Sequence, residues 1–156
     1  YNNSRSWIYD VKDQGYRFHM SNINAAIGLT QLKKIKQISI KRRKVFLKLN
    51  KFIKNSDNLI KPEDITKKIV PFIYVIRLKK NRDKIMQFLK TKGIDTGIHW
   101  QPCHKFTKFK KSPKGNMKNT NKICNEILTL PMYPELKISE IKQIGIQIGK
   151  ALKTFN

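Results

Sequence analysis

The chain has 156 residues, 39% of them hydrophobic, which suits one main hydrophobic core and is too few for two. Its formal net charge of +24 comes from 34 Lys and Arg against 10 Asp and Glu; the cations lie in every segment, so charge alone singles out no nucleic-acid surface. No run approaches the roughly 20 apolar residues of a membrane span and no signal segment opens the chain, so we expect a cytoplasmic protein without membrane contact.

The first predicted element is a helix that begins after Ser21, a good N-cap residue. Arg17, His19 and Asn22 bring cationic and hydrogen-bonding groups close to this helix N-terminus, where unpaired amides and the macrodipole already favour an anion. The pattern indicates a candidate phosphate contact. An ordinary capped helix with a polar lead-in is the alternative interpretation.

This helix extends to about residue 55, because the segment contains no proline and its apolar residues recur at nearly helical intervals. Residues 38–40 form a weak point, since Ser39 lies between two β-branched residues, so we expect one bent helix or two abutting ones. Such a helix either braces two domains or a subunit interface, or packs on its own sheet.

Polar residues and a proline between residues 56 and 64 predict a division into two parts, 1–55 and 56–156. The second part alternates between strands and helices, which favours a small two-layer α/β sandwich. Its predicted elements are an edge strand 69–78 with Pro71 near its start, a helix capped by Asn81 and stopped by Gly93, a strand 94–100, a helix 120–127, an extended piece 128–130 and a helix capped by Ser139.

Candidate binding residues cluster after the predicted strand 94–100. His99 and His104 supply imidazoles that can bind phosphate or sugar hydroxyls, and Trp100 offers a flat face for a ring. A satisfied structural role for the histidines is the alternative. Cys103 and Cys124 add two thiols, but the spacing is not a usual zinc pattern, so we expect free cysteines and no metal site.

A lysine-rich stretch, residues 105–118, contains two phenylalanines and could in principle stack bases. It contains no nucleic-acid motif, and a solvated loop is the simpler interpretation.

Three segments, residues 15–32, 93–104 and 130–134, follow one another with the order and spacing of a known family. In this respect the whole chain closely resembles the C-terminal part of the pyridoxal-phosphate-dependent nucleotide-sugar aminotransferases, the DegT/DnrJ/StrS family. The resemblance implies a long linking helix followed by the small C-terminal α/β domain of a fold-type-I aminotransferase. It also implies a homodimer that transfers an amino group from glutamate to a keto group of a nucleotide-activated sugar, as in amino-sugar and polysaccharide biosynthesis.

The resemblance also assigns site residues. In the family the Schiff-base lysine precedes the segment that begins at Gly15, so we expect it upstream of this chain and expect the chain alone to be inactive. Arg17, His19 and Asn22 become candidates for binding pyridoxal 5'-phosphate, although the family often has Asn where Arg17 stands, reaching the cofactor phosphate of the neighbouring subunit. His99, Trp100 and His104 become candidates for binding substrate. The competing hypothesis is a non-catalytic basic domain that binds nucleic acid through residues 41–54 and 105–118.

Overall fold

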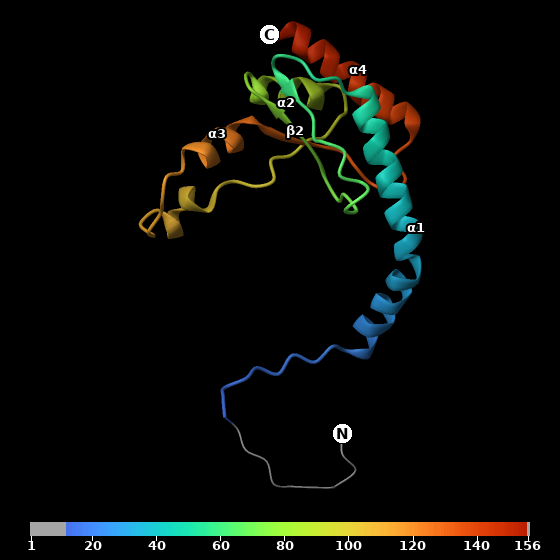
Figure 1. The fold of residues 1–156 in the computed structure, drawn as a ribbon, viewed down its shortest axis with the longest axis vertical. Coiled ribbons are helices and arrows are strands. Elements are labelled where there is room, and N and C mark those ends of the chain that lie inside the picture. The colour runs from blue at the N-terminus through green and yellow to red at the C-terminus, as the bar shows by residue number, and fades with distance from the viewer. Residues whose placement is uncertain (1–11, 156) are drawn as a thin grey trace. The chain divides into compact units, whose positions relative to one another are not determined.

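The computed structural model describes residues 12–155, and the ribbon is drawn in Figure 1. The chain forms two compact units that divide between Ile35 and Lys36. The elements are, in order, α1 (Asn22–Phe52), β1 (Leu59–Ile60), β2 (Tyr74–Leu78), α2 (Arg82–Thr91), the 3₁₀ turns η1 (Cys103–Lys105) and η2 (Thr107–Phe109), α3 (Lys118–Glu126), β3 (Ile127–Leu130) and α4 (Ile138–Thr154). Among these helices, none is long and apolar enough to cross a membrane.

The predicted long helix is confirmed as a single element, α1, which is helical throughout 31 residues. Residues 38–40, the expected weak point, lie inside it without interrupting it. Three side chains near its end, those of Val45, Phe46 and Leu49, are buried. The end of α1 therefore belongs to the hydrophobic core of the second unit, because those residues are in the same core cluster as the sheet and α4.

The sheet has three antiparallel strands in the order β1-β2-β3. Tyr74 is paired with Leu130 at one end of β2, and Leu78 is paired with Leu59 at the other. The strand predicted within residues 69–78 is confirmed as β2, but its expected edge position is wrong: β2 is central and begins three residues after Pro71, which leaves the proline outside the hydrogen-bonded ladder. The two-residue strand β1 was not predicted, since it falls in the polar segment after α1.

The predicted strand 94–100 is also wrong. This segment forms only one isolated bridge, in which Gly97 and Thr129 exchange two backbone hydrogen bonds of 3.1 and 2.8 Å. Thr129 belongs to β3, which is paired with β2 along its four residues. The segment is consequently an extended loop attached to the sheet at one point.

The core lies between one face of the sheet and the helices that cover it. Tyr74, Ile76 and Leu78 alternate along β2 and are almost fully buried, which is the period expected of a strand with one face in the core. Helices α2 and α4 contact each other, and α4 crosses the end of α1, where Gly145 lies so close to Phe52 that an added Cβ would be 3.0 Å from its carbonyl oxygen. The predicted two-layer sandwich is confirmed.

Helix ends differ in detail from the predicted caps. Asn81 stands at the N-cap of α2, but in the left-handed conformation (φ 57°) its side chain makes no cap bond and donates instead to the carbonyl of Phe155 at 2.7 Å. Gly93 has φ 71° just after α2, as expected of a helix-stopping glycine. The predicted Ser139 cap of α4 is wrong, because the helix begins one residue earlier and the Glu140 carboxylate accepts a 2.7 Å bond from the backbone N–H of Lys137.

Two arginines connect helix α3 to the rest of the second unit, one on β2 and one on α2. The Arg77 guanidinium donates to the largely buried Glu126 carboxylate at 2.7 and 3.1 Å. Arg82 donates to the carbonyls of Cys124 and Ile127 at 3.4 and 3.1 Å, where α3 passes into β3. These contacts fix the position of a helix that carries one side of the candidate site.

The division into 1–55 and 56–156 stays a prediction about the domains of the assembled protein. In the chain itself the second compact unit begins within α1, at Lys36.

Tyr74 is expected to make stability depend on alkaline pH. Its hydroxyl donates to the Asn50 amide oxygen at 2.5 Å, and burial raises its pKa above the ordinary value of about 10. Above about pH 10, the phenol of Tyr74 is therefore ionised in the unfolded chain but still neutral in the folded one. The stabilisation is complete below about pH 10 and falls by up to about 1.4 kcal/mol per pH unit above it.

The measurement is urea unfolding of the wild type and of Tyr74→Phe between about pH 8.5 and 11. The variant has the same lysines as the wild type but lacks the phenol, so the difference between the two proteins isolates Tyr74. The stability advantage of the wild type over Tyr74→Phe should shrink above about pH 10. A difference that stays constant over this range would contradict the prediction.

Candidate functional site

The start of α1 is capped as predicted. The Ser21 hydroxyl accepts a hydrogen bond from the backbone N–H of Asn24 at 3.2 Å. The first turn of the helix contains no acidic residue, and the sequence has none between Asp13 and Asp57. The positive end of the helix dipole is thus left without a carboxylate to neutralise it.

The three residues predicted near this helix start are all exposed. Two of them meet: the Arg17 Nε–H donates to Nε2 of His19 at 2.5 Å. Asn22 is the first residue of α1, and in the described part of the chain its side chain is bonded to neither of them. The remaining guanidinium N–H groups of Arg17 point to no partner among residues 12–155, so they are available to a ligand.

This donor set suits a phosphate group. A guanidinium supplies planar, charge-assisted donors, and a helix N-terminus supplies backbone amides. Among the described residues, no acidic side chain forms a hydrogen bond or ion pair with Arg17, and the sequence from Gln14 to Ser56 contains no Asp or Glu. The lead-in and helix start therefore have the chemistry required to bind the phosphate of a cofactor.

The other predicted residues lie in the second unit, after the bridge at Gly97. His99 Nδ1 and Thr129 Oγ1 share a 3.0 Å hydrogen bond, which ties the loop to β3. Trp100 is 66% exposed, and its ring lies edge-on to the His99 imidazole with 5.5 Å between centroids. The structure therefore brings His99 and Trp100 together at the surface of the loop.

His104 lies in η1 and is directed to another partner. Its Nε2 shares a 3.0 Å hydrogen bond with Oδ1 of Asn121 on α3. On the same helix, Cys124 Sγ lies 3.8 Å from the Trp100 carbonyl oxygen. His104 thus joins the loop to α3, a contact that orders the segment whether or not it also binds substrate.

Sequence reasoning missed Thr129 and Asn121, the side chains that hold the two imidazoles. Thr129 is the one polar residue of β3, and it is buried. The signal available in the sequence was a hydroxyl residue between apolar neighbours, since such a group, once buried, requires a hydrogen-bond partner. Neither Thr129 nor Asn121 is near its histidine in the chain, since they are 30 and 17 residues away.

No metal cluster forms from the described side chains: nowhere in residues 12–155 do three His, Cys, Asp or Glu residues gather as ligands would. Cys103 and Cys124 are both free thiols.

The lysine-rich stretch contains η2 and continues as an irregular loop to α3. Phe106 and Phe109 are 47% and 46% exposed, so roughly half of each side chain is available for contact. A hollow behind this loop is lined by Pro102, His104 and Phe109 among others.

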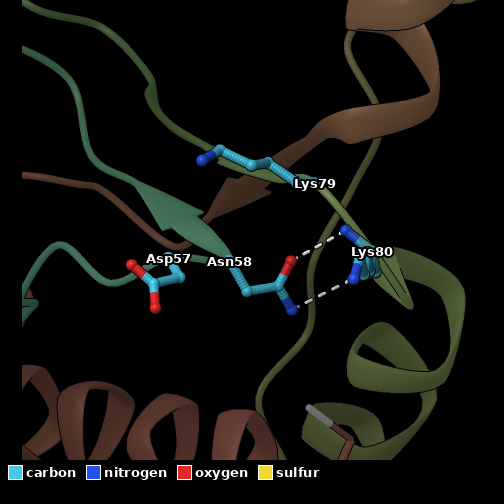
Figure 2. A pocket seen from close by; sticks show the side chains of 4 residues that line it. All are labelled: Asp57, Asn58, Lys79 and Lys80. Atoms are coloured by element: carbon cyan, nitrogen blue, oxygen red, sulfur yellow. Dashed lines mark hydrogen bonds between the residues drawn. The ribbon is translucent and has the colours of Figure 1, made fainter.

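A separate pocket lies where β1 meets the end of β2, lined by Asp57, Asn58, Lys79 and Lys80 (Figure 2). The buried Asn58 amide spans the backbone of Lys80: its Oδ1 accepts from the N–H at 2.7 Å, and its Nδ2 donates to the carbonyl at 3.3 Å. Both polar ends of this side chain are satisfied by the backbone. The arrangement is a structural clamp on the sheet, and none of the predicted site residues lies there.

The comparisons with known proteins bear on the whole chain. The sequence profile of the DegT/DnrJ/EryC1/StrS aminotransferase family matches residues 2–148. An uncharacterized protein of Methanocaldococcus jannaschii is 33% identical over 96% of this chain and 41% of its own length. A dTDP-4-dehydro-2,3,6-trideoxy-D-glucose 4-aminotransferase of Saccharopolyspora spinosa is 24% identical over 96% of this chain and 39% of its own length.

Among solved structures, PseC of Helicobacter pylori, an aminotransferase involved in pseudaminic acid biosynthesis, has a similar fold. Its TM-score is 0.82 at 21% identity, over 97% of this chain and 43% of that one. The chain thus spans about two fifths of the length of the proteins that it matches.

Proposed function

Because the chain belongs to the DegT/DnrJ/EryC1/StrS aminotransferase family, we propose that it is the C-terminal part of a sugar aminotransferase that uses pyridoxal 5'-phosphate. The observation that carries the proposal is the family match over residues 2–148. The amino donor is glutamate, and the acceptor is a keto group of a nucleotide-activated sugar.

Support for a nucleotide-activated sugar comes from the S. spinosa relative, whose name specifies a dTDP-sugar. Discrimination among sugars lies in pocket contacts, so the motifs shared by a family leave the sugar and the carbon that receives the amine open.

Arg17, His19 and Asn22 would hold the phosphate of the cofactor. The absence of acidic residues from the first turn of α1 and the guanidinium donors of Arg17 fit this group. When bound, pyridoxal phosphate supplies the electron sink that amino-group transfer requires. The contribution of this chain is to bind and orient it, while the Schiff-base lysine lies upstream of the chain.

His99, Trp100 and His104 would contact the sugar-nucleotide substrate. An imidazole can donate to a hydroxyl or a phosphate oxygen, and an exposed indole can stack on a ring. Of the three, His99 and Trp100 present a shared surface, and His104 is bonded through Nε2 to Asn121. We therefore assign the substrate contact first to His99 and Trp100.

The experiment begins with the full-length protein, expressed from the reading frame that contains this chain. Lysine-bound cofactor absorbs near the edge of the visible range, and glutamate should bleach this band as the amino group is transferred. Keto sugars attached to dTDP, UDP and GDP are then offered in turn as acceptors. The 156-residue chain is the control, and we expect it to transfer no amino group.

Absence of a cofactor band from the full-length protein would contradict the proposal. Glutamate-dependent transfer by the 156-residue chain, with the cofactor trapped on one of its lysines, would overturn only the assignment of the catalytic lysine to an upstream domain.

A second candidate function is nucleic-acid binding, which the exposed Phe106 and Phe109 in the lysine-rich stretch favour. Binding to arbitrary oligonucleotides that weakens steeply with salt would support it. No binding at low ionic strength would exclude it.

We also propose that the assembled protein is a homodimer in which the first half of α1 is covered. Its apolar side chains Ile23, Ile27, Leu29 and Leu32 are all more than half exposed in this chain. At 100° per residue they point to different sides of the helix, a pattern typical of a helix that is surrounded rather than one with a single buried stripe.

The isolated chain is therefore expected to self-associate. Sedimentation velocity should show association that increases with concentration, and the double variant Leu29→Gln/Leu32→Gln should reduce it. Ile146→Gln is the matched control, because Ile146 is 49% exposed on α4 without such a cluster around it. A monodisperse monomer at all concentrations would show that the exposed side chains do not drive association.

A further inference from the structure

The imidazole of His99 is confined on one side by a glycine. A Cβ atom added at Gly97 would lie 2.7 Å from Cε1 of the ring and 3.3 Å from Nδ1. Real Cβ atoms essentially never approach another heavy atom to less than 3.0 Å. The ring therefore occupies its present place only because residue 97 has no side chain. The backbone conformation does not require glycine here, since Gly97 is not among the positive-φ residues.

On another side the ring is held by Thr129. Its hydroxyl shares the 3.0 Å bond with Nδ1, and the residue is only 7% exposed. Thr129 is also fixed through its backbone, because its N–H and carbonyl both bond to Gly97. A β-branched side chain on a paired strand has little χ1 freedom, so the hydroxyl is a stationary partner for the ring.

The other ring nitrogen remains available. Within residues 12–155 the structure gives Nε2 of His99 no hydrogen-bond partner, and the ring borders an open hollow that Asp95, Thr96 and Pro131 also line. The Thr129 hydroxyl can donate to Nδ1 or accept from it, so it engages Nδ1 in either tautomer of the neutral ring and leaves Nε2 as the ring nitrogen that can meet a ligand.

We infer that Gly97 and Thr129 are positioning residues that fix the place and the plane of the His99 imidazole, so that Nε2 faces an oxygen of the sugar-nucleotide substrate. The inference rests on the proposed function, because it requires that His99 contacts substrate. It adds two residues to which the family resemblance assigned no role. Each of them would affect substrate binding only through the position of the His99 ring.

The first measurement is of the ring itself, in full-length protein labelled with ¹⁵N at histidine. Imidazole ¹⁵N resonances report the hydrogen bonding of each ring nitrogen, and the His99 signals are identified by their loss in His99→Gln. We expect the same Nδ1 resonance in the wild type and in Thr129→Ser, which keeps the hydroxyl. Thr129→Val, of nearly the same shape, should shift the Nδ1 resonance because the hydrogen bond is lost, and Gly97→Ala should shift it because the ring is displaced from Thr129. His104 signals should be unchanged throughout.

The second measurement is a double-mutant cycle on KM for the sugar substrate. Loss of one substrate hydrogen bond corresponds to a rise in KM of about threefold to tenfold. We expect Thr129→Val and His99→Gln each to raise KM by about this factor, Thr129→Ser to restore the wild-type value, and Thr129→Val to add nothing in the His99→Gln background. If Thr129 had only a structural role, Thr129→Val would still raise KM in the His99→Gln background.

The outcomes are separable. Identical His99 signals in the wild type and Thr129→Val would overturn the positioning roles, whatever the kinetics. Altered signals with an unchanged KM in His99→Gln would overturn the substrate contact, while cofactor binding and amino transfer by the same protein would leave the aminotransferase assignment standing.

Discussion

Arg17→Ala in the full-length protein is expected to weaken the binding of pyridoxal 5'-phosphate by about tenfold to a hundredfold. This is the factor that corresponds to losing a hydrogen bond to a charged group. The physical reason is that Arg17 lies beside a helix start without acidic residues, and its guanidinium has donors to spare after its bond to His19. The affinity is measured by titrating cofactor into protein from which it has been removed.

Two controls make this result specific to the phosphate contact. Arg17→Asn introduces the amide that the family often has at this position, so it should bind more tightly than Arg17→Ala. Arg42→Ala removes an arginine of α1 that donates to the carbonyl of Phe72 at 2.9 Å, a contact within the fold, and should leave cofactor affinity unchanged. Wild-type affinity in Arg17→Ala would show that the phosphate is bound by other groups.

Long, strongly patterned elements could be predicted from the sequence. α1 was predicted from its uninterrupted apolar periodicity, and the stripe Ile141, Ile144 and Ile148 of α4 is buried as that spacing requires. Both predictions rest on residues within one helix, where a period of 3.6 fixes which side chains share a face. The family also could be recognised, because its motifs are local sequences.

Strand pairing could not be predicted in the same way, because it depends on a partner elsewhere in the chain. Residues 94–100 have the β-branched and aromatic content of a strand, yet they meet β3 at Gly97 alone. Conversely, β1 has only two residues and no detectable pattern, and it exists because Leu59 and Ile60 meet the end of β2.

The candidate site shows the same limit. The imidazoles were identified from the sequence, but what each one bonds to was not, because Thr129 and Asn121 come from distant segments. This distinction affects the chemistry. One histidine is bonded through Nδ1 and the other through Nε2, so different nitrogens are left to meet a ligand.

Leu49→Ala is expected to lower the free energy of unfolding of the second unit by about 2 to 5 kcal/mol, the range for a large core side chain replaced by alanine. Leu49 is fully buried in the cluster that also contains Tyr74 and Ile141. A typical domain is stable by only about 5 to 15 kcal/mol, so the loss is a large part of the total.

Leu47→Ala is the matched control for this prediction, since the same substitution is made on the same helix at a side chain that is 43% exposed. It should change stability by about 0.5 kcal/mol or less. Urea unfolding followed by circular dichroism, at a concentration low enough to keep the chain monomeric, measures both variants. Equal effects would mean that the end of α1 does not share a core with the sheet, whereas a large effect of Leu49→Ala alone means that the helix cannot detach without unfolding the sandwich.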